Sequence, residues 1–286
     1  MSTTPAEPLA AYRAAYAKEV AGDQDPRVVA AFAAVPREVF LGPPPWWTGS
    51  GGGGRWHETG AVGDLYQDIL VSLDRGKGIN NGQPSLHARC IAALGLTKTD
   101  HVLHVGAGTG YYTAILAELA GSVVGYEIEP RLAAAATANL APWPNARIRH
   151  ENATGRALPE ADALYVSAGA SHPDPSWLDA LRPGGRLLFP LTGGGVRSGA
   201  GGMLLVRRPA TPHPPAYAAR FLDRVSFIAC AGARDDAEAA RLAAVFAEGG
   251  EDTVRSLWRG TPDGASVWFA GDGWSLSTEP VPQPDA

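Results

Sequence analysis

The sequence predicts an α/β protein built on a doubly wound, mostly parallel sheet. Three features that follow one another support this fold class: a short apolar strand, a turn made of glycines and an apolar helix. They are residues 102–105, then Gly106, Gly108 and Gly110, and then residues 113–119. A second strand over residues 123–126 ends at Glu127. A strand that breaks into glycines and restarts as a helix is typical of a nucleotide-binding corner.

Glu127 indicates which kind of nucleotide this corner binds. An acid at the end of the second strand is placed to accept hydrogen bonds from ribose hydroxyls. A dinucleotide-binding turn has its third glycine one residue later, where this chain has Tyr111. The sequence therefore predicts a nucleoside-type cofactor and disfavours a nicotinamide oxidoreductase. A solvated strand end is the other interpretation of Glu127.

The N-terminal region predicts two helices followed by an irregular segment. An alanine-rich helix is expected over residues 9–20 and a short one over residues 26–34, which starts on a proline. Residues 42–54 are rich in proline and glycine and contain Trp46 and Trp47. We expect this segment to form a mobile lid or a disordered excursion, because it cannot build a core of its own.

A strand is expected over residues 65–73, and a turn-rich loop leads from it into a helix over residues 86–94. Ser85 is the expected N-cap of that helix. The loop contains Asn80-Asn81-Gly82, which either shapes a left-handed turn or contacts cofactor or substrate. His87 is either a packed histidine or a catalytic one.

The rest of the chain predicts alternating strands and helices and then a tail. Strands are expected over 147–149, 164–166, 187–191, 203–207 and 221–229, with a helix over 175–181. The tail predicts a helix over 235–246, a strand over 253–258 and a hairpin that turns at residues 271–273. We expect three regions: helices and lid over residues 1–60, the cofactor-binding domain over 61–230, and an extension over 231–286 that packs on the domain.

Composition excludes several classes of function. The chain has 286 residues with 24 basic and 29 acidic side chains, and this net charge of −5 offers no basic field to nucleic acid. Cys90 and Cys230 match no metal spacing and are expected to pack as small hydrophobes in a reducing cytoplasm. No apolar run approaches membrane-spanning length and the start has no signal-like pattern, so a cytoplasmic protein without a membrane partner is expected.

The chain resembles class I S-adenosylmethionine-dependent methyltransferases, and most of all the protein-L-isoaspartate O-methyltransferase family. The resemblance runs over residues 25–230. Its segments are VPREVF at 35–40, YQD at 66–68, PSLHA at 84–88, VLHVGAGTGY at 102–111, VVGYEIEP at 123–130, ADALYV at 161–166, LRPGGRLL at 181–188 and MLLV at 203–206.

This resemblance implies a Rossmann-like sheet with an antiparallel edge strand and S-adenosyl-L-methionine as cofactor. It also implies a carboxylate acceptor, an isoaspartyl or aspartyl residue in a protein or peptide. The altered loop described below leaves room for a different acceptor, such as a small-molecule acid. The implied cofactor-binding residues are Gly106, Ala107, Gly108, Gly110, Tyr111, Glu127, Ile128, Asn152, Ala153 and Ser167. The implied acceptor-side residues are Asn80, Asn81, Gly82 and His87.

The chain departs from the family at two places. Family members carry Thr-Ile-Ser where this chain has Asn80-Asn81-Gly82, so a carboxamide or a backbone N–H must replace the serine hydroxyl that the resemblance implies. His104 stands where the family has an acid that helps to hold the methionine end of the cofactor. A neutral imidazole accepts a hydrogen bond there, whereas a protonated one repels the sulfonium.

Methyl transfer to a carboxylate requires little of the protein. The carboxylate is ionised at neutral pH, so positioning and exclusion of water suffice without a general base. A hydroxyl or amine acceptor would need a base, for which His87 or Asp68 is the first candidate. The alternatives are a methyltransferase for another acceptor and a cofactor-binding protein without turnover. The sequence does not indicate which oligomeric state the protein adopts.

Overall fold

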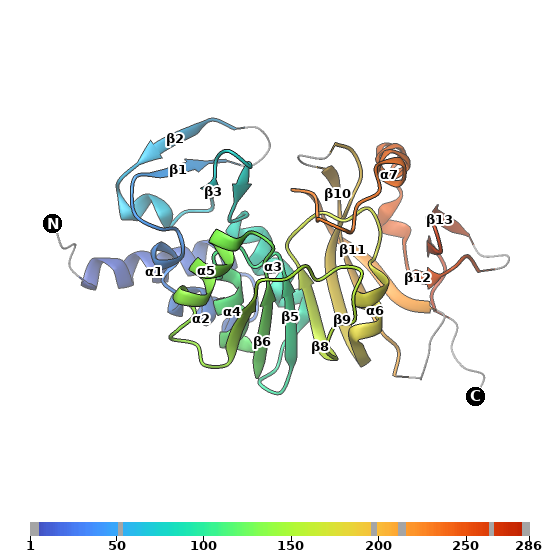
Figure 1. Ribbon diagram of the computed structural model, residues 1–286, viewed down its shortest axis with the longest axis horizontal. Coiled ribbons are helices and arrows are strands. Elements are labelled where there is room, and N and C mark those ends of the chain that lie inside the picture. The colour runs from blue at the N-terminus through green and yellow to red at the C-terminus, as the bar shows by residue number, and fades with distance from the viewer. Residues whose placement is uncertain (1–5, 51–53, 196–198, 211–215, 263–265, 282–286) are drawn as a thin grey trace. The chain divides into compact units, whose positions relative to one another are not determined.

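The computed structural model describes residues 6–50, 54–195, 199–210, 216–262 and 266–281 (Figure 1). The chain forms two compact units that interleave along the sequence. Residues 1–100 and 107–151 form unit 1, and residues 101–106 and 152–286 form unit 2. The boundary within the glycine motif falls after Gly106, which belongs to unit 2.

Unit 1 begins with helices that pack around aromatic side chains. They are α1 (Ala6–Ala21), α2 (Pro26–Ala34), the 3₁₀ turn η1 (Arg37–Phe40) and α3 (Pro84–Leu94). Asp25 caps α2 by accepting from the backbone N–H of Arg27 at 2.8 Å, and Pro26 occupies the first helical position. Phe32 of α2 packs edge-on against Tyr111 with ring centroids 6.4 Å apart.

A small antiparallel sheet lies between η1 and α3 in the sequence. Its strands lie in the order β2 (Trp56–Thr59), β1 (Trp46–Gly49), β3 (Leu70–Asp74) and β4 (Ile79–Asn80), and η2 (Val62–Leu65) precedes β3. Trp46 is buried in a cluster with Leu41, Leu65 and Val71. The expectation of a mobile lid or disordered excursion is therefore wrong for the described part of residues 42–54, where Trp46 supplies the apolar contact that fixes a strand. Residues 51–53 lie outside the described residues.

The elements of the second half of unit 1 begin after the glycine turn. They are α4 (Tyr111–Leu119), β6 (Ser122–Tyr126), α5 (Pro130–Asn139) and β7 (Ala146–Arg149), and β6 and β7 pair in parallel.

The expected strand over residues 65–73 is partly wrong, because the chain is a 3₁₀ turn up to Leu65 and becomes a strand only at Leu70. The buried guanidinium of Arg37 bonds the carbonyl oxygens of Leu65, Gln67 and Ile69 in between.

Unit 2 contains a sheet that changes from parallel to antiparallel, with neighbouring strands visible in Figure 1. The parallel strands are β5 (His101–Val105), β8 (Ala161–Val166) and β9 (Leu181–Thr192). The antiparallel strands continue from β9 in the order β10 (Gly199–Arg207), β11 (Ala216–Phe227), β12 (Ser256–Arg259), β14 (Trp274–Ser277) and β13 (Val267–Ala270). The fold class is confirmed, with an antiparallel part broader than one edge strand.

The remaining elements of unit 2 are α6 (Pro175–Ala180), α7 (Asp236–Glu248) and the 3₁₀ turn η3 (Glu251–Thr253). The buried Glu238 of α7 accepts from the Trp274 indole N–H at 2.9 Å, which holds the expected hairpin β13–β14 to this helix. The tail packs on the sheet because β12 pairs with β11. Both cysteines are buried and free, as expected. No helix within the described ranges is long and apolar enough to cross a membrane.

Candidate active site

The glycine turn between β5 and α4 is shaped by backbone that favours glycine. Gly108 and Gly110 have φ angles of +57° and +95°. The N–H of Ala107 donates to the carbonyl oxygen of Tyr126 at 3.0 Å, which fixes the turn against β6. Helix α4 begins at Tyr111, so the N–H groups of its first turn lie directly after the glycines. The turn and the helix of the expected corner are present, and their contacts with a cofactor stay predictions.

Tyr111 contributes to this corner through its backbone. Its side chain is 2% exposed and packs against Phe40, with its hydroxyl 3.2 Å from that of Tyr16. The side chain is therefore part of the aromatic core of unit 1. A cofactor-binding role for Tyr111 stays a prediction for its N–H group alone.

Glu127 is held beside the glycine turn by two backbone hydrogen bonds. Its Oε2 accepts from the N–H of Gly108 at 2.7 Å, and its Oε1 accepts from the N–H of Glu129 at 2.9 Å. Burial raises the pKa of the carboxyl above its usual 4.5, and these backbone donors oppose that shift. Each carboxylate oxygen can accept more than one hydrogen bond. Glu127 is thus a fixed, buried acceptor with capacity for two further donors.

Ile128 follows this carboxylate and exposes an apolar side chain. The residue is 45% exposed, and its carbonyl oxygen accepts from His150 Nε2 at 3.1 Å. An exposed isoleucine directly after the acid that is predicted to bind ribose offers an apolar contact for a base. The predicted contact between Ile128 and the cofactor is compatible with this placement and stays a prediction.

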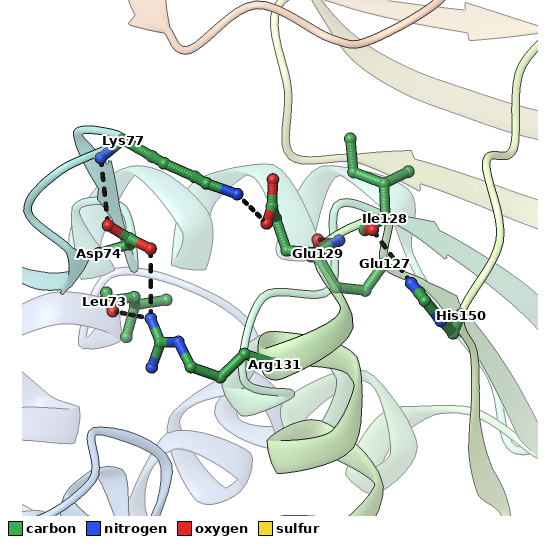
Figure 2. Close-up of polar contacts among 8 residues, drawn as sticks. All are labelled: Leu73, Asp74, Lys77, Glu127, Ile128, Glu129, Arg131 and His150. Carbon is green, nitrogen blue, oxygen red and sulfur yellow. Dashed lines mark hydrogen bonds and ion pairs between the residues drawn. The ribbon is translucent and has the colours of Figure 1, made fainter.

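Two ion pairs join the segment after Glu127 to the turn between β3 and β4. Figure 2 shows Lys77 extended to Glu129, and Arg131 reaching back to Leu73 and Asp74. Arg131 Nη2 donates to the Leu73 carbonyl oxygen at 2.8 Å and lies 3.5 Å from Asp74 Oδ2. We call these contacts the clasp. A β-carbon placed on Gly108 would lie 3.4 Å from the Leu73 side chain, so the turn packs directly on the glycine motif.

The loop Asn80-Asn81-Gly82 is held by its own side chains. Asn80 Oδ1 accepts from the N–H of Gly82 at 2.9 Å, and Asn81 Oδ1 accepts from the N–H of Val71 at 2.8 Å. Asn81 is 8% exposed, and its Nδ2 is buried without a hydrogen-bond partner in the described part of the chain. Asn80 therefore shapes the turn, whereas Asn81 retains two N–H donors for an acceptor that the protein does not supply.

The packing of His87 leaves no space for a side chain at Gly82. Gly82 has a φ of +73°, and a β-carbon there would lie 2.2 Å from His87 Nε2. The His87 ring stacks on Tyr112 with centroids 3.7 Å apart and is 2% exposed. The imidazole thus occupies the space that a side chain at position 82 would need. His87 is packed in the core, and its catalytic contact stays a prediction.

Asp68 fixes the exit of this loop. It accepts from Gln83 Nε2 at 2.8 Å, from the N–H of Ser85 at 2.8 Å and from the Ser85 hydroxyl at 2.6 Å. The prediction that Ser85 is the N-cap of α3 is wrong: Gln83 is the N-cap residue, without a side-chain capping bond, and Ser85 binds Asp68 instead. A carboxylate with three donors is a poor candidate for a general base.

In unit 2, His104 and Ser167 lie at the carboxyl ends of β5 and β8. His104 Nε2 is 3.0 Å from Ser167 Oγ, and burial lowers the pKa of His104 to about 3. The imidazole is therefore neutral at pH 7 and does not repel a sulfonium by charge. Gly106, with a φ of +78°, would place a β-carbon 3.5 Å from the backbone of Ser167. The cofactor-binding roles of Gly106 and Ser167 stay predictions.

Asn152 and Ala153 lie in a turn that follows β7 in the sequence. Asn152 Oδ1 accepts from both the N–H and the hydroxyl of Thr154, at 3.2 and 2.9 Å. Ala153 is 1% exposed, and its carbonyl oxygen accepts from the Trp177 indole at 2.8 Å. Asn152 therefore offers a cofactor its N–H groups rather than its oxygen, which suits a ring nitrogen better than the adenine amino group. Both roles stay predictions.

Sequence reasoning missed the clasp and the role of Asp68. Lys77 and Glu129 are 52 residues apart, and no periodicity in one sequence links them. The sequence offers Asp68 only as a candidate base, because its three donors depend on how α3 begins. Arg37 is fully buried, and nothing in its segment VPREVF predicts that burial.

Comparison with known proteins identifies close similarity over the site-bearing part of the chain. A family model described as protein-L-isoaspartate(D-aspartate) O-methyltransferase matches residues 57–198. A protein-L-isoaspartate O-methyltransferase of Dechloromonas aromatica is 34% identical over 213 residues, which cover 72% of this chain and 86% of the relative. A relative from Anaeromyxobacter sp. with the same described activity is 38% identical over 175 residues, 59% of this chain and 74% of the relative.

Solved structures show the same fold. One protein-L-isoaspartate O-methyltransferase superposes with a TM-score of 0.61 at 20% identity, covering 84% of this chain and 68% of the other. A Plasmodium falciparum protein described as such a methyltransferase, solved with S-adenosyl-L-homocysteine, gives a TM-score of 0.57 at 18% identity, covering 77% and 98%.

Proposed function

Because the chain belongs to the protein-L-isoaspartate O-methyltransferase family, we propose that it transfers a methyl group from S-adenosyl-L-methionine to the carboxylate of an isoaspartyl residue in a protein or peptide. The family identifies the reaction class and the cofactor. The local geometry of this chain supports the proposal and indicates which residues perform each part.

The observation that supports it most strongly is the carboxylate of Glu127 beside the glycine turn. The acid is buried, fixed by the N–H of Gly108 and has capacity for two more donors. Gly108 has a φ of +57° and no side chain, so nothing of its own covers the backbone at this turn. These residues fit the ribose of S-adenosyl-L-methionine. When bound, this cofactor supplies a methyl group that its sulfonium has already activated.

The acceptor side fits a nucleophile that is ionised before it binds. A carboxylate attacks without losing a proton, so the protein must position it and exclude water. Asp68 is engaged by three donors and His87 is stacked in the core, and neither is arranged as a general base. A hydroxyl or amine acceptor is therefore less compatible with this loop than a carboxylate.

Asn81 is the part of the loop that we assign to binding. Its Oδ1 is used by Val71, which leaves the Nδ2 donors for an acceptor atom on cofactor or substrate. A buried N–H without a partner costs on the order of 1–3 kcal/mol, and a bound acceptor recovers that cost. This amide takes the part that the serine hydroxyl plays in the family's pattern.

The same departure favours a second candidate, methyl transfer to a different carboxylate. Gly82 and His87 change the shape of the loop as well as its chemistry, because the imidazole fills the space beside position 82. An aspartyl residue or a small-molecule acid is then the acceptor, with the cofactor site unchanged.

The test combines cofactor binding with labelled methyl transfer. Calorimetry measures S-adenosyl-L-homocysteine binding, and labelled S-adenosyl-L-methionine is offered with an isoaspartyl peptide and, separately, with a cell extract. We expect binding and label on the peptide. Label in the extract alone contradicts the isoaspartyl acceptor and supports the second candidate. Binding without any label contradicts methyl transfer altogether.

A further inference from the structure

The loop over residues 80–82 contains the only Asn-Gly pair in the sequence, Asn81-Gly82. In such a pair the backbone nitrogen of the glycine can attack the side-chain carbonyl carbon of the asparagine, because glycine has no β-carbon to hinder the approach. A bond forms between the Gly82 nitrogen and Asn81 Cγ, the N–H proton passes to a base in the solvent, and Nδ2 takes up a proton and leaves as ammonia. Water then opens the resulting succinimide to an aspartyl or an isoaspartyl residue.

Asn80 holds the nitrogen that makes this attack. Its Oδ1 accepts from the N–H of Gly82 at 2.9 Å. The nitrogen becomes a nucleophile only when that proton is lost, and a hydrogen-bonded amide proton is exchanged only through local opening of the structure. The bond to Asn80 therefore has to open before the attack starts. Gly82 is also held through its carbonyl oxygen, which accepts from the Tyr112 hydroxyl at 3.4 Å.

Asn81, which carries the carbon under attack, is held by β3. Its Oδ1 accepts from the N–H of Val71 at 2.8 Å, and its own N–H donates to the Val71 carbonyl oxygen at 3.0 Å. Closing the succinimide ring requires a rotation about the Cα–Cβ bond away from the staggered rotamers in which side chains ordinarily lie. The side-chain bond to Val71 resists this rotation, and the backbone bond keeps the residue in place.

From these contacts we propose that Asn81-Gly82 is a deamidation site and that Asn80 protects it. The protection is kinetic, because the loop reacts only in the fraction of molecules in which the hydrogen bond between Asn80 and Gly82 is open. A residue at position 80 without a side-chain oxygen would leave the same N–H without this acceptor. Asn80 thus has a role beyond shaping the turn, which is to keep the chemistry of its neighbour unchanged with time.

Deamidation would also change what the loop offers to a ligand. It replaces the carboxamide of Asn81, whose Nδ2 is buried without a partner in the described part of the chain, by a carboxylate. The product therefore lacks the N–H donors that we assign to acceptor binding. This consequence for methyl transfer rests on the proposed function, whereas the protective role of Asn80 does not.

The experiment follows deamidation in the folded protein and in an unfolded reference. The purified protein is incubated at mildly alkaline pH, where loss of the N–H proton is faster, and samples are digested with trypsin at mildly acidic pH. Cleavage after Lys77 and Arg89 releases residues 78–89, in which Asn80 and Asn81 are the only asparagines. Mass spectrometry measures the conversion of amide to acid and assigns it to one of the two. A synthetic peptide of residues 78–89 gives the rate without the fold.

The proteins are wild type, Asn80→Ala, Asn80→Leu, Asn80→Asp and Gln83→Ala, each compared with a peptide of its own sequence. Asn80→Ala and Asn80→Leu remove the acceptor oxygen, and leucine retains the shape of the side chain if alanine does not support the fold. Asn80→Asp keeps an acceptor oxygen in the same place. Gln83→Ala is the matched control, because the Gln83 side chain donates to Asp68 Oδ2 at 2.8 Å. Thermal unfolding shows that each variant is folded.

The ratio of the peptide rate to the protein rate measures the protection at Asn81. We expect a ratio of at least about tenfold for wild type, since the reacting N–H is exposed only by local opening. Asn80→Ala and Asn80→Leu should reduce this ratio about three- to tenfold, which corresponds to the loss of one hydrogen bond. Asn80→Asp and Gln83→Ala should keep the wild-type ratio.

Three results would overturn the proposal. The first is a wild-type protein that deamidates at Asn81 as fast as its peptide. The second is equal protection in wild type, Asn80→Ala and Asn80→Leu. The third is an equal loss of protection in Gln83→Ala, because general loosening of the loop would then account for the effect. Methyl transfer that stays constant while Asn81 deamidates would instead overturn the assignment of Asn81 to acceptor binding and leave the protective role of Asn80 intact.

Discussion

Glu127→Ala tests the assignment of the cofactor site through a change whose size follows from the structure. Two ribose hydroxyls donating to a buried carboxylate would contribute about 1.5 kcal/mol each. Part of this is offset, because the variant no longer keeps a desolvated charge. We therefore expect a net loss on the order of 1–3 kcal/mol, or about a five- to 150-fold increase in Kd for S-adenosyl-L-homocysteine.

The pH dependence of binding gives this prediction a sharper form. Burial raises the pKa of Glu127, so wild-type affinity should fall as the pH drops through that raised value, and Glu127→Ala should not show this fall. The raised pKa also means that Glu127 stabilises the folded state only when it is protonated. This contribution to the free energy of unfolding is complete below the unfolded pKa of about 4.5 and is lost as the pH rises through the higher pKa of the folded state. Loss of its charge therefore does not itself destabilise the protein at pH 7.

Calorimetry measures the affinity, and thermal unfolding shows that the variant is folded. Glu129→Ala is the control, because it removes a nearby carboxylate that binds Lys77 rather than the glycine turn. We expect the Kd of that variant to stay within about twofold of the wild-type value, because a partly exposed ion pair contributes little free energy. Unchanged affinity in Glu127→Ala, with the fold intact, would refute the ribose assignment.

Three further predictions concern the acceptor loop and the buried histidine. Asn81→Asp keeps the acceptor oxygen and removes the free N–H donors, so the rate of methyl transfer should fall about tenfold or more with unchanged cofactor affinity. Asn80→Asp adds the same charge at the preceding residue and should retain activity. Equal rates in the two variants would contradict the role of Asn81. Burial lowers the pKa of His104 to about 3, so the free energy of unfolding should fall as the pH drops below about 6.5, by about 2 kcal/mol at pH 5 relative to pH 8. Denaturant unfolding measures this pH dependence. The same pH dependence in His104→Gln would argue against a role for His104. Gly82→Ser should destabilise the protein by about 1–3 kcal/mol, and His87→Ala should relieve part of that cost in a double-mutant cycle; additive effects would show that the two positions do not compete for space.

Local pattern predicted the secondary structure around the glycine turn correctly. The strand before Gly106, the glycine turn and the strand that ends at Glu127 depend on short-range rules of periodicity and glycine conformation, and all three are present. The hairpin that turns near Gly271 followed from the same kind of signal. These features need no knowledge of distant contacts.

Side-chain partners across long sequence separations could not be predicted in this way. The prolines and glycines around Trp46 predict a mobile or disordered segment, but Trp46 is buried in a cluster with Leu65 and Val71. Local sequence predicts Ser85 as an N-cap, but its hydroxyl donates to Asp68 instead. The ion pair between Lys77 and Glu129 joins residues far apart in the chain, so a single sequence carries no sign of it.

The selectivity between matched isoaspartyl and aspartyl peptides tests the central claim most directly. The two peptides differ only in which carboxyl group of the residue continues the chain, so kcat/KM for each, measured with labelled S-adenosyl-L-methionine, isolates recognition of the acceptor. We predict label on the isoaspartyl peptide and at least about a tenfold lower kcat/KM for the aspartyl one. Equal values for the two peptides, or no label on either while the cofactor still binds, would contradict the account.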